Sequence, residues 1–203
     1  DDTLWYRIGC MYLHGIGTEA DETKAEHYLT KASDYGNAHA SYQLARLYIR
    51  QESQKLSGES GTAPDYAKIA KAVKWLEESA AQENLFADYA LGRLYREGTL
   101  VVADMEKAVF HLKRAADAGN SYAQYQLGKI YLEEDTRNIP AAIQYLTLAA
   151  KQKNEFAAYR LGKLYLAGEE LPKNTELALH YLKMAADTGN QYAQYALGKV
   201  YLI

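Results

Sequence analysis

Histidine, cysteine and closely placed carboxylates are the side chains that build most metal sites and catalytic sites. The histidines of this chain are His14, His27, His39, His111 and His180. None of them belongs to a His-Glu-x-x-His motif, which would place two zinc ligands on one helix face. Cys10 lacks a histidine partner at a regular spacing, and acidic pairs such as Glu133-Glu134 are typical of solvated surfaces. The sequence therefore predicts no catalytic residue, no metal ion and no other cofactor, and we expect a protein that is not an enzyme.

Aromatic and cationic side chains, in contrast, recur together at the spacing of one helix face. We place Leu161 on the core side of a helix. At about 100° per residue, Phe156, Tyr159 and Lys163 then lie about 140° to 220° away, on the opposite side. The corresponding positions elsewhere hold Tyr42, Arg46, Phe86, Tyr89, Arg93, Tyr122, Tyr125, Lys129, Tyr192, Tyr195 and Lys199. We call these side chains the stripe, and they are our candidate partner-binding residues.

The stripe recurs because the sequence itself repeats. The motif Tyr-x-Leu-Gly-x-x-Tyr begins at Tyr89, Tyr125, Tyr159 and Tyr195, and variants of it begin at Tyr6 and Tyr42. The small residue after Leu or Ile lies at positions 9, 45, 92, 128, 162 and 198, with gaps of 36, 47, 36, 34 and 36 residues. A period of this length is typical of stacked helical repeats.

A second helical motif, Ala-x-x-Tyr-Leu-x-x-Ala-Ala, follows each of the first five anchors and is clearest at 142–150 and 178–186. Asn37, Asn84, Asn120, Asn154 and Asn190 close the units, while Asp21, Asp104, Asn138 and Asn174 are suited to cap the second helix. We predict five helix pairs plus one lone helix, eleven helices in total, without a β-sheet. The first helices are expected near 86–97, 122–132, 156–167 and 192–202.

Glycine recurs in the middle of these first helices, where it costs about 1 kcal/mol relative to alanine. A repeated cost suggests a repeated benefit, and close approach of the paired second helix is the natural one. We therefore expect Gly128 and Gly162 to face that helix, with alanine pairs opposite them. The same reasoning makes His111 a packing residue, because it stands where the other second helices carry Tyr or Trp.

These motifs resemble the Sel1-like repeat family, which is related to the tetratricopeptide repeats. The resemblance covers the whole chain and implies an all-α fold, a right-handed α-α superhelix (solenoid) of helix-turn-helix repeats. It also implies a scaffold or adaptor for other proteins, as is usual for bacterial members of the family. In the cysteine-rich secreted branch of the family, a disulfide cross-links each repeat. This chain has a single cysteine and therefore lies outside that branch.

We interpret residues 1–203 as a single repeat array. Its units are 3–37, 38–84, 85–120, 121–154 and 155–190, followed by a partial unit at 191–203. The 47-residue gap reflects an insertion, and the Ser-, Gly- and Glu-rich stretch at about 51–63 is expected to form a mobile loop. Pro64 and Asp65 then restart a helix, which is expected to gain a turn through Tyr66 and Ile69.

Both ends of the sequence carry apolar residues in repeat register, including Trp5 and Leu197. End repeats of solenoids normally carry polar caps. We therefore expect the sequence to be a fragment of a longer array, and we expect its ends to associate with another copy.

The predicted function is a protein–protein interaction scaffold that binds an extended peptide or a helix on its concave surface, which the first helices line. The cations of the stripe favour an acidic partner. An alternative is an accessory repeat module of a larger bacterial enzyme, such as the conjugative relaxase of a mobile element. The formal net charge of -3 argues against direct contact with nucleic acid.

Two interpretations of the stripe remain open. The tyrosines either pack between successive first helices or contact a ligand, and both hold if ring faces pack while hydroxyls point into the groove. The sequence contains no apolar run of about 18 residues, so we expect no membrane span. A bacterial cytoplasmic location is expected because neither a signal peptide nor a disulfide pattern is visible.

Overall fold

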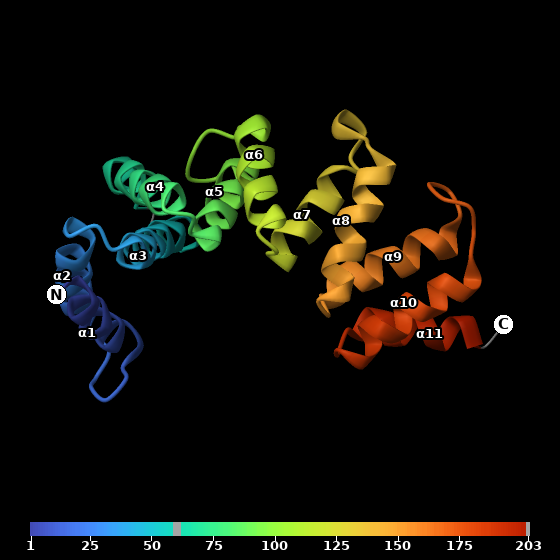
Figure 1. Cartoon of the computed structure of the whole chain (residues 1–203), viewed down its shortest axis with the longest axis horizontal. Helices are drawn as coiled ribbons and strands as arrows, with labels where there is room; N and C mark the ends of the chain where they lie inside the picture. Colours follow the sequence, from blue (N-terminus) through green and yellow to red (C-terminus); the bar gives the residue numbers. More distant parts are fainter. Residues whose placement is uncertain (59–61, 202–203) are drawn as a thin grey trace. The chain divides into compact units, whose positions relative to one another are not determined.

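Helices make up nearly all of the chain, and the computed structural model describes residues 1–58 and 62–201 (Figure 1). The α-helices are α1 (Asp2–His14), α2 (Glu22–Asp34), α3 (Ala38–Ser57), α4 (Tyr66–Ala81), α5 (Leu85–Glu97), α6 (Met105–Asp117), α7 (Ser121–Ile130), α8 (Ile139–Lys151), α9 (Glu155–Ala167), α10 (Thr175–Asp187) and α11 (Gln191–Tyr201). A 3-10 helix, η1, spans Glu134–Thr136. These residues contain no strand, so the predicted all-α class and the predicted eleven α-helices are confirmed over the described part of the chain.

The helices form two compact parts, residues 1–111 and 112–203, which we call the N-terminal part and the C-terminal part. Odd-numbered helices open a repeat and are called A-helices, and even-numbered helices complete it and are called B-helices. In the N-terminal part, consecutive helices from α1 to α5 pack on one another, and consecutive helices from α7 to α11 do the same in the C-terminal part. Stacking of consecutive helix pairs is the solenoid arrangement that the sequence predicted.

Short polar residues start these helices, as their capping chemistry requires. The Asn37 and Asn154 side chains accept the backbone N–H groups of Ala40 and Ala157, and thereby cap α3 and α9. Asp21, Asp104, Asn138 and Asn174 accept N–H groups of α2, α6, α8 and α10, as predicted.

A residue with a left-handed backbone conformation follows the B-helices α2, α4, α6, α8 and α10. Gly36, Gly119 and Gly189 adopt this conformation after α2, α6 and α10. After α4 and α8, however, Glu83 and Lys153 adopt it, both with φ of 62°. The asparagines that follow them are extended, because they cap the next A-helix.

Glycine allows the A-helices to approach their B-helices closely. A Cβ atom at Gly128 would lie 2.5 Å from Cγ of Leu146, and one at Gly162 would lie 2.7 Å from Cγ of Leu182. Both leucines are fully buried. The glycines therefore leave the space that these leucine side chains occupy on the facing helices. The predicted close approach is confirmed at these positions, but the side chains opposite the glycines are leucines and not the expected alanine pairs.

A second contact joins the two helices of each repeat through aromatic rings. Tyr12 and Tyr28 stack with ring centroids 5.9 Å apart, and Tyr165 and Tyr181 stack at 6.0 Å. The equivalent pairs are Tyr48–Trp75, Tyr95–His111 and Tyr131–Tyr145. His111 is therefore a packing residue, as predicted, and its Nδ1 lies 2.9 Å from Oδ1 of the buried Asp88.

The inserted segment is largely helical, which contradicts the predicted loop at 51–63. Helix α3 continues through residues 51–57, whereas α1, α5 and α9 end at left-handed glycines. The position equivalent to those glycines is Gln51, which gives no signal to stop. Residues 62–65 have no regular structure, and residues 59–61 lie outside the described part. Helix α4 does begin at Tyr66, as expected.

A buried carboxylate fastens this longer α3 to the start of α4. Glu52 is fully buried, and its oxygens accept hydrogen bonds from Lys55 Nζ at 2.9 and 2.8 Å. One of them also accepts the backbone N–H of Asp65 at 2.7 Å. The hydrogen bond from Lys55 holds the pKa of Glu52 below its usual value, although burial opposes it.

Helix α7 is shorter than predicted. It ends at Ile130 instead of 132, and the chain then turns through η1. Thr136 donates its hydroxyl to the carbonyl of Ile130 at this turn. The predicted last residue of the final helix, 202, lies outside the described residues, and α11 is described to Tyr201.

Candidate partner-binding surface

In the N-terminal part, the predicted stripe lies on α3 and α5. The ring of Tyr42 contacts the ring of Phe86 with centroids 6.3 Å apart, so one residue from each A-helix joins neighbouring repeats. The Arg46 guanidinium lies 5.5 Å from the Tyr42 centroid, within reach of a cation–π contact. Burial raises the pKa of Tyr42 against the lowering effect of Arg46. Tyr42 is half-buried and Phe86 is exposed.

Arg93 does not extend the row of available cations. Its Nη2 lies 2.6 Å from Oε1 of Glu97, one turn further along α5. This charge-assisted hydrogen bond raises the pKa of Arg93 above its ordinary value. Tyr89 also interacts with Arg93 and is half-buried. The positive charge expected on this helix is thus balanced by a neighbouring carboxylate.

In the C-terminal part, the stripe lies on α7, α9 and α11, which meet through aromatic contacts. Tyr125 of α7 contacts Phe156 of α9 at 5.9 Å, and Tyr159 of α9 contacts Tyr192 of α11 at 6.1 Å. Both pairs are tilted by similar angles, 34° and 37°. The rings therefore form the same contact between successive repeats.

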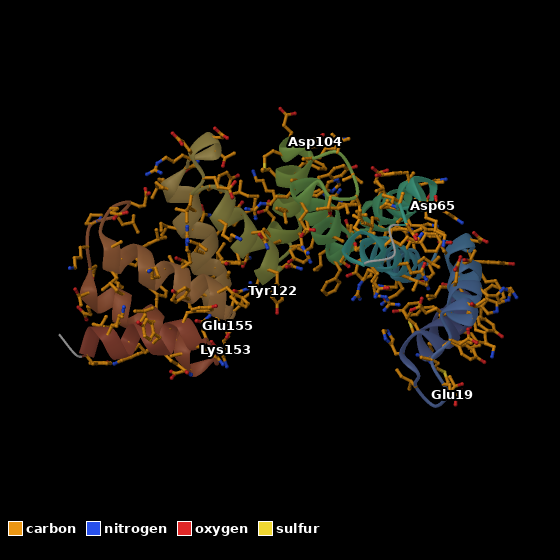
Figure 2. The ribbon with its side chains drawn as sticks, turned by 180° about the vertical axis from the view of Figure 1, so that it is seen from behind. Glu19, Asp65, Asp104, Tyr122, Lys153 and Glu155 are labelled. Atoms are coloured by element: carbon orange, nitrogen blue, oxygen red, sulfur yellow. The ribbon has the colours of Figure 1, made fainter. Side chains whose placement is uncertain are left out.

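The starts of α7 and α9 lie side by side as well. The Asn154 side chain donates a hydrogen bond to the carbonyl of Ser121 at 3.4 Å. Figure 2 shows Tyr122, at the start of α7, near Lys153 and Glu155 at the start of α9. Tyr122 is an exposed member of the stripe.

These packed rings are also accessible. Phe156 is 47% exposed, Tyr192 is 72% exposed and Tyr195 is 66% exposed. None of the stripe residues is fully buried. The structure thus supports a packing role for the rings and leaves part of each stripe side chain open to a partner.

The lysines of the C-terminal stripe lie one turn after a tyrosine. Lys129 Nζ is 5.5 Å from the centroid of Tyr125, and Lys199 Nζ is 4.8 Å from that of Tyr195. Lys163 is exposed and forms no ion pair with the residues that the structure describes. All three cations therefore accompany the aromatic row.

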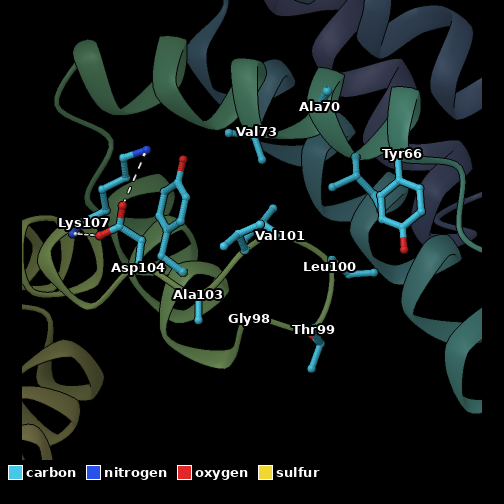
Figure 3. A pocket seen from close by; sticks show the side chains of 13 residues that line it. Tyr66, Ala70, Val73, Gly98, Thr99, Leu100, Val101, Ala103, Asp104 and Lys107 are labelled. Atoms are coloured by element: carbon cyan, nitrogen blue, oxygen red, sulfur yellow. Dashed lines mark hydrogen bonds and ion pairs between the residues drawn. The ribbon is translucent and has the colours of Figure 1, made fainter.

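Sequence reasoning missed a groove outside the stripe, between α4 and the segment that links α5 to α6 (Figure 3). Its volume is about 710 Å³. Ile69, Tyr95 and Leu100 are buried lining residues, whereas Tyr66 and Val102 are exposed. At one end Lys107 and Asp104 form an ion pair of 3.8 Å, drawn as a dashed line.

Two departures from the repeat pattern create this groove. The insertion lets α4 begin six residues before its leading Ala72, whereas α2 begins three residues before Ala25. The linking segment reads Leu-Val-Val at 100–102, whereas the equivalent segments read Gly-Thr-Glu at 17–19 and Glu-Leu-Pro at 170–172. The unusual apolar run was visible in the sequence, but its partner surface on α4 was not.

No cluster of three or more His, Cys, Asp or Glu side chains that could hold a metal ion occurs in the described part. A search of the same residues found no helix of sufficient length and apolar character to cross a membrane.

The architecture defines an all-α repeat protein whose consecutive helix pairs pack through small residues and aromatic rings. The sequence profile of the Sel1 repeat matches residues 6–37, 38–84, 85–120, 121–154, 156–190 and 191–203. The chain therefore belongs to the Sel1 repeat family. Repeats of this family generally mediate protein–protein interaction and form non-catalytic scaffolds.

Solved structures of bacterial proteins share the fold. A protective antigen of uropathogenic Escherichia coli strains, described as displaying an SLR fold, is 28% identical with a TM-score of 0.81. A Sel1 repeat protein from Oxalobacter formigenes is 25% identical with a TM-score of 0.80. Both comparisons cover 99% of this chain, which spans 41% of the Escherichia protein and 76% of the Oxalobacter protein. An immunity protein from Pseudomonas aeruginosa, at 24% identity and a TM-score of 0.55, shares 95% of this chain and 67% of its own length.

Proposed function

We propose that this chain is an adaptor that holds an extended peptide or a helix of another protein against the stripe of its A-helices. The observation that carries the proposal is the row of accessible rings on α9 and α11, namely Phe156, Tyr192 and Tyr195. Their helices pack on neighbouring helices through small buried residues such as Ala157 and Ala193. Rigid aromatic rings lose little conformational entropy on binding and are common anchors in protein interfaces.

The proposed partner is acidic in part. Lys129 and Lys199 lie beside stripe tyrosines, so an approaching segment meets a ring and a cation together. Carboxylates form charge-assisted hydrogen bonds with such cations, while apolar side chains pack on the rings. A segment that alternates the two kinds of side chain fits this arrangement.

A peptide selection followed by variants on the stripe tests the proposal. Peptides of twelve residues are selected from a random phage-displayed library against the whole chain, synthesised with a fluorescein label and titrated by fluorescence polarisation. We expect Tyr192→Ser together with Tyr195→Ser to weaken binding by about tenfold or more, as loss of interface anchors does. Circular dichroism should show an unchanged helical content, because both rings are largely exposed.

Tyr66→Ser is the matched control, because Tyr66 is as exposed as Tyr195 but lies on α4. It should bind the selected peptides like the unaltered chain. Equal binding by the double variant would contradict the proposal, as would a selection that enriches no peptide.

A further inference from the structure

We infer that the C-terminal part supplies the recognition of carboxylates, and that Arg160 and Lys163 of α9 are the side chains that bind them. The inference rests on the proposed function, since it concerns the same A-helix surface. It adds Arg160, which lies outside the stripe, and it assigns an acidic segment of a partner protein to one of the two parts.

The first support is an imbalance of charge on the A-helices of the C-terminal part. Over their described lengths, α7, α9 and α11 carry four cations, Lys129, Arg160, Lys163 and Lys199, and a single carboxylate, Glu155. Residues 112–203 contain 11 basic and 9 acidic residues, whereas residues 1–111 contain 12 and 17. The excess of positive charge is therefore confined to the A-helices, because acidic residues elsewhere in residues 112–203 nearly balance it.

The A-helices of the N-terminal part are closer to balance, because α1, α3 and α5 carry six cations and four carboxylates over their described lengths, and several of these cations are already paired. Arg93 is bound to Glu97 at 2.6 Å, and Lys55 is bound to the buried Glu52. Arg50 of α3 is bound to Glu22 of α2, also at 2.6 Å. An incoming carboxylate would have to displace a carboxylate that is already in place, so it would gain little energy from these cations.

Arg160 and Lys163 have no such competitor. Both are exposed, and within the described residues neither forms an ion pair or a side-chain hydrogen bond. Arg160 follows Phe156 by four residues and Lys163 follows Tyr159 by four, so each cation lies one turn from a ring on the same face. The guanidinium group can bind a carboxylate with two parallel hydrogen bonds, which adds directional specificity.

Helix α9 is also the central member of this surface. Its Phe156 contacts α7 and its Tyr159 contacts α11, so Lys129 and Lys199 lie on the two flanking helices. A partner segment that crosses the three helices would meet the cations of α9 midway. Acidic residues near the middle of a short segment, with aromatic or aliphatic residues on either side, match this order.

Charge also favours a peptide over a nucleic acid. The ends of α7 and α9 are followed by acidic segments, Glu133-Glu134-Asp135 and Glu169-Glu170, although Glu170 is bound to Arg137. A nucleic acid carries a charge at every nucleotide and gains affinity by neutralising many phosphates at once. Carboxylates bordering the surface would repel such a chain, whereas a peptide can place its acids over α9 alone.

The test uses the whole chain and the peptides selected in the preceding experiment. The inference predicts that these peptides are enriched in Asp and Glu, and that replacing those residues by Asn and Gln weakens binding. Arg160→Glu together with Lys163→Glu should weaken binding by about tenfold or more, because it replaces attraction by repulsion at the contact. The matched control is Lys113→Glu together with Lys151→Glu on α6 and α8 of the same part, which changes the net charge equally and should alter binding by less than about threefold.

Each other outcome overturns the inference in a recognisable way. If Lys113→Glu together with Lys151→Glu weakens binding as much as Arg160→Glu together with Lys163→Glu, only the overall charge of the chain matters. If Arg46→Glu together with Arg93→Glu has the larger effect, acid recognition lies in the N-terminal part, and the proposed function survives. If the double variant of Arg160 and Lys163 and the double variant of Tyr192 and Tyr195 both bind normally, the inference and the proposed function fail together. Tighter binding of a fluorescein-labelled oligothymidine than of the peptides would identify a nucleic acid surface instead.

Discussion

At the scale of single residues, the A-helix glycines show how one missing atom sets the distance between two helices. The Cβ that Gly128 lacks would overlap the side chain of Leu146, which fills the space between α7 and α8. Gly198 of α11 has the same motif position, but nothing described lies within 4 Å of the Cβ it lacks. One motif position therefore has two different environments, and substitution should distinguish them.

Replacing Gly128 with Leu is expected to lower the free energy of unfolding by about 1–3 kcal/mol, because the added side chain must push Leu146 or separate the helices. Gly198→Leu is the matched control and should leave the free energy of unfolding unchanged or slightly raise it, since leucine favours helix formation more than glycine. Urea denaturation followed by circular dichroism measures both. Equal stability of the two variants would mean that Gly128 does not face α8.

The raised pKa of Tyr48 predicts that the folded protein loses stability at alkaline pH. Burial and the hydrogen bond that it donates to Glu26 raise its pKa to about 12, from an ordinary value of 10.0. Between these values the unfolded chain loses the proton first, so the folded chain binds more protons and becomes less stable as pH rises. Urea denaturation from pH 10 to pH 12 should therefore show a shallower decline for Tyr48→Phe than for the unaltered chain. A decline of identical slope would contradict the raised pKa of Tyr48.

At the scale of elements, the sequence predicted helix pairs well because each pair repeats the same few contacts. Recurrent Tyr, Gly and Ala positions mark the packed faces of α5 to α11, and α6, α8 and α10 begin where capping residues predicted. The extension of α3 was missed because composition suggested a loop, whereas the informative feature was the absence of a glycine at Gln51. The contact of Glu52 with Asp65 joins residues 13 apart and was not visible as a pattern.

Glu52→Gln should destabilise the protein at neutral pH by about 1–3 kcal/mol, because Lys55 and the Asp65 N–H lose a charged acceptor. The folded pKa of Glu52 lies below 4.5, so its contribution is present above that value and disappears as pH falls through the lowered pKa. The difference between the two proteins should therefore shrink in strongly acidic solution. Urea denaturation across acidic pH measures it.

The matched control for that variant is Glu78→Gln, which removes an exposed ion pair of 3.7 Å with Lys74 on α4. Exposed pairs contribute at most about 1 kcal/mol, so this variant should be close to the unaltered protein at every pH. If Glu52→Gln behaved in the same way, the buried carboxylate would not fasten the insertion to α4.

At the scale of the whole molecule, repeats contact mainly their neighbours, so a local defect should stay local. Gly162→Leu places extra atoms against Leu182 between α9 and α10. Hydrogen–deuterium exchange is expected to accelerate in α9, α10 and the adjoining α8 and α11, while α1 to α4 of the N-terminal part keep their protection. Acceleration of similar size in every helix would show instead that the chain unfolds as one cooperative unit.

The candidate surface was only partly predictable at this scale. Helical periodicity found the stripe because one side of a helix can be deduced from spacing alone. The pairing of Arg93 with Glu97 was open to the same reasoning, since residues four apart on a helix are neighbours. Arg160 was overlooked because the same motif position holds a cation in only one other repeat, Arg7, and Gln or Ala elsewhere. The groove beside Val102 depends on residues more than 30 positions apart.

The ring contacts between successive A-helices have an evolutionary consequence. Tyr159 is at once a spacer between α9 and α11 and a side chain offered to a partner, so a substitution that changes recognition also changes how the repeats fit. Arg160 and Lys163 on the same surface form no such contact between helices within the described residues. Related chains can therefore change partner by exchanging charged residues without disturbing the helix packing. Exchange of the aromatic residues also alters that packing and is expected to be slower.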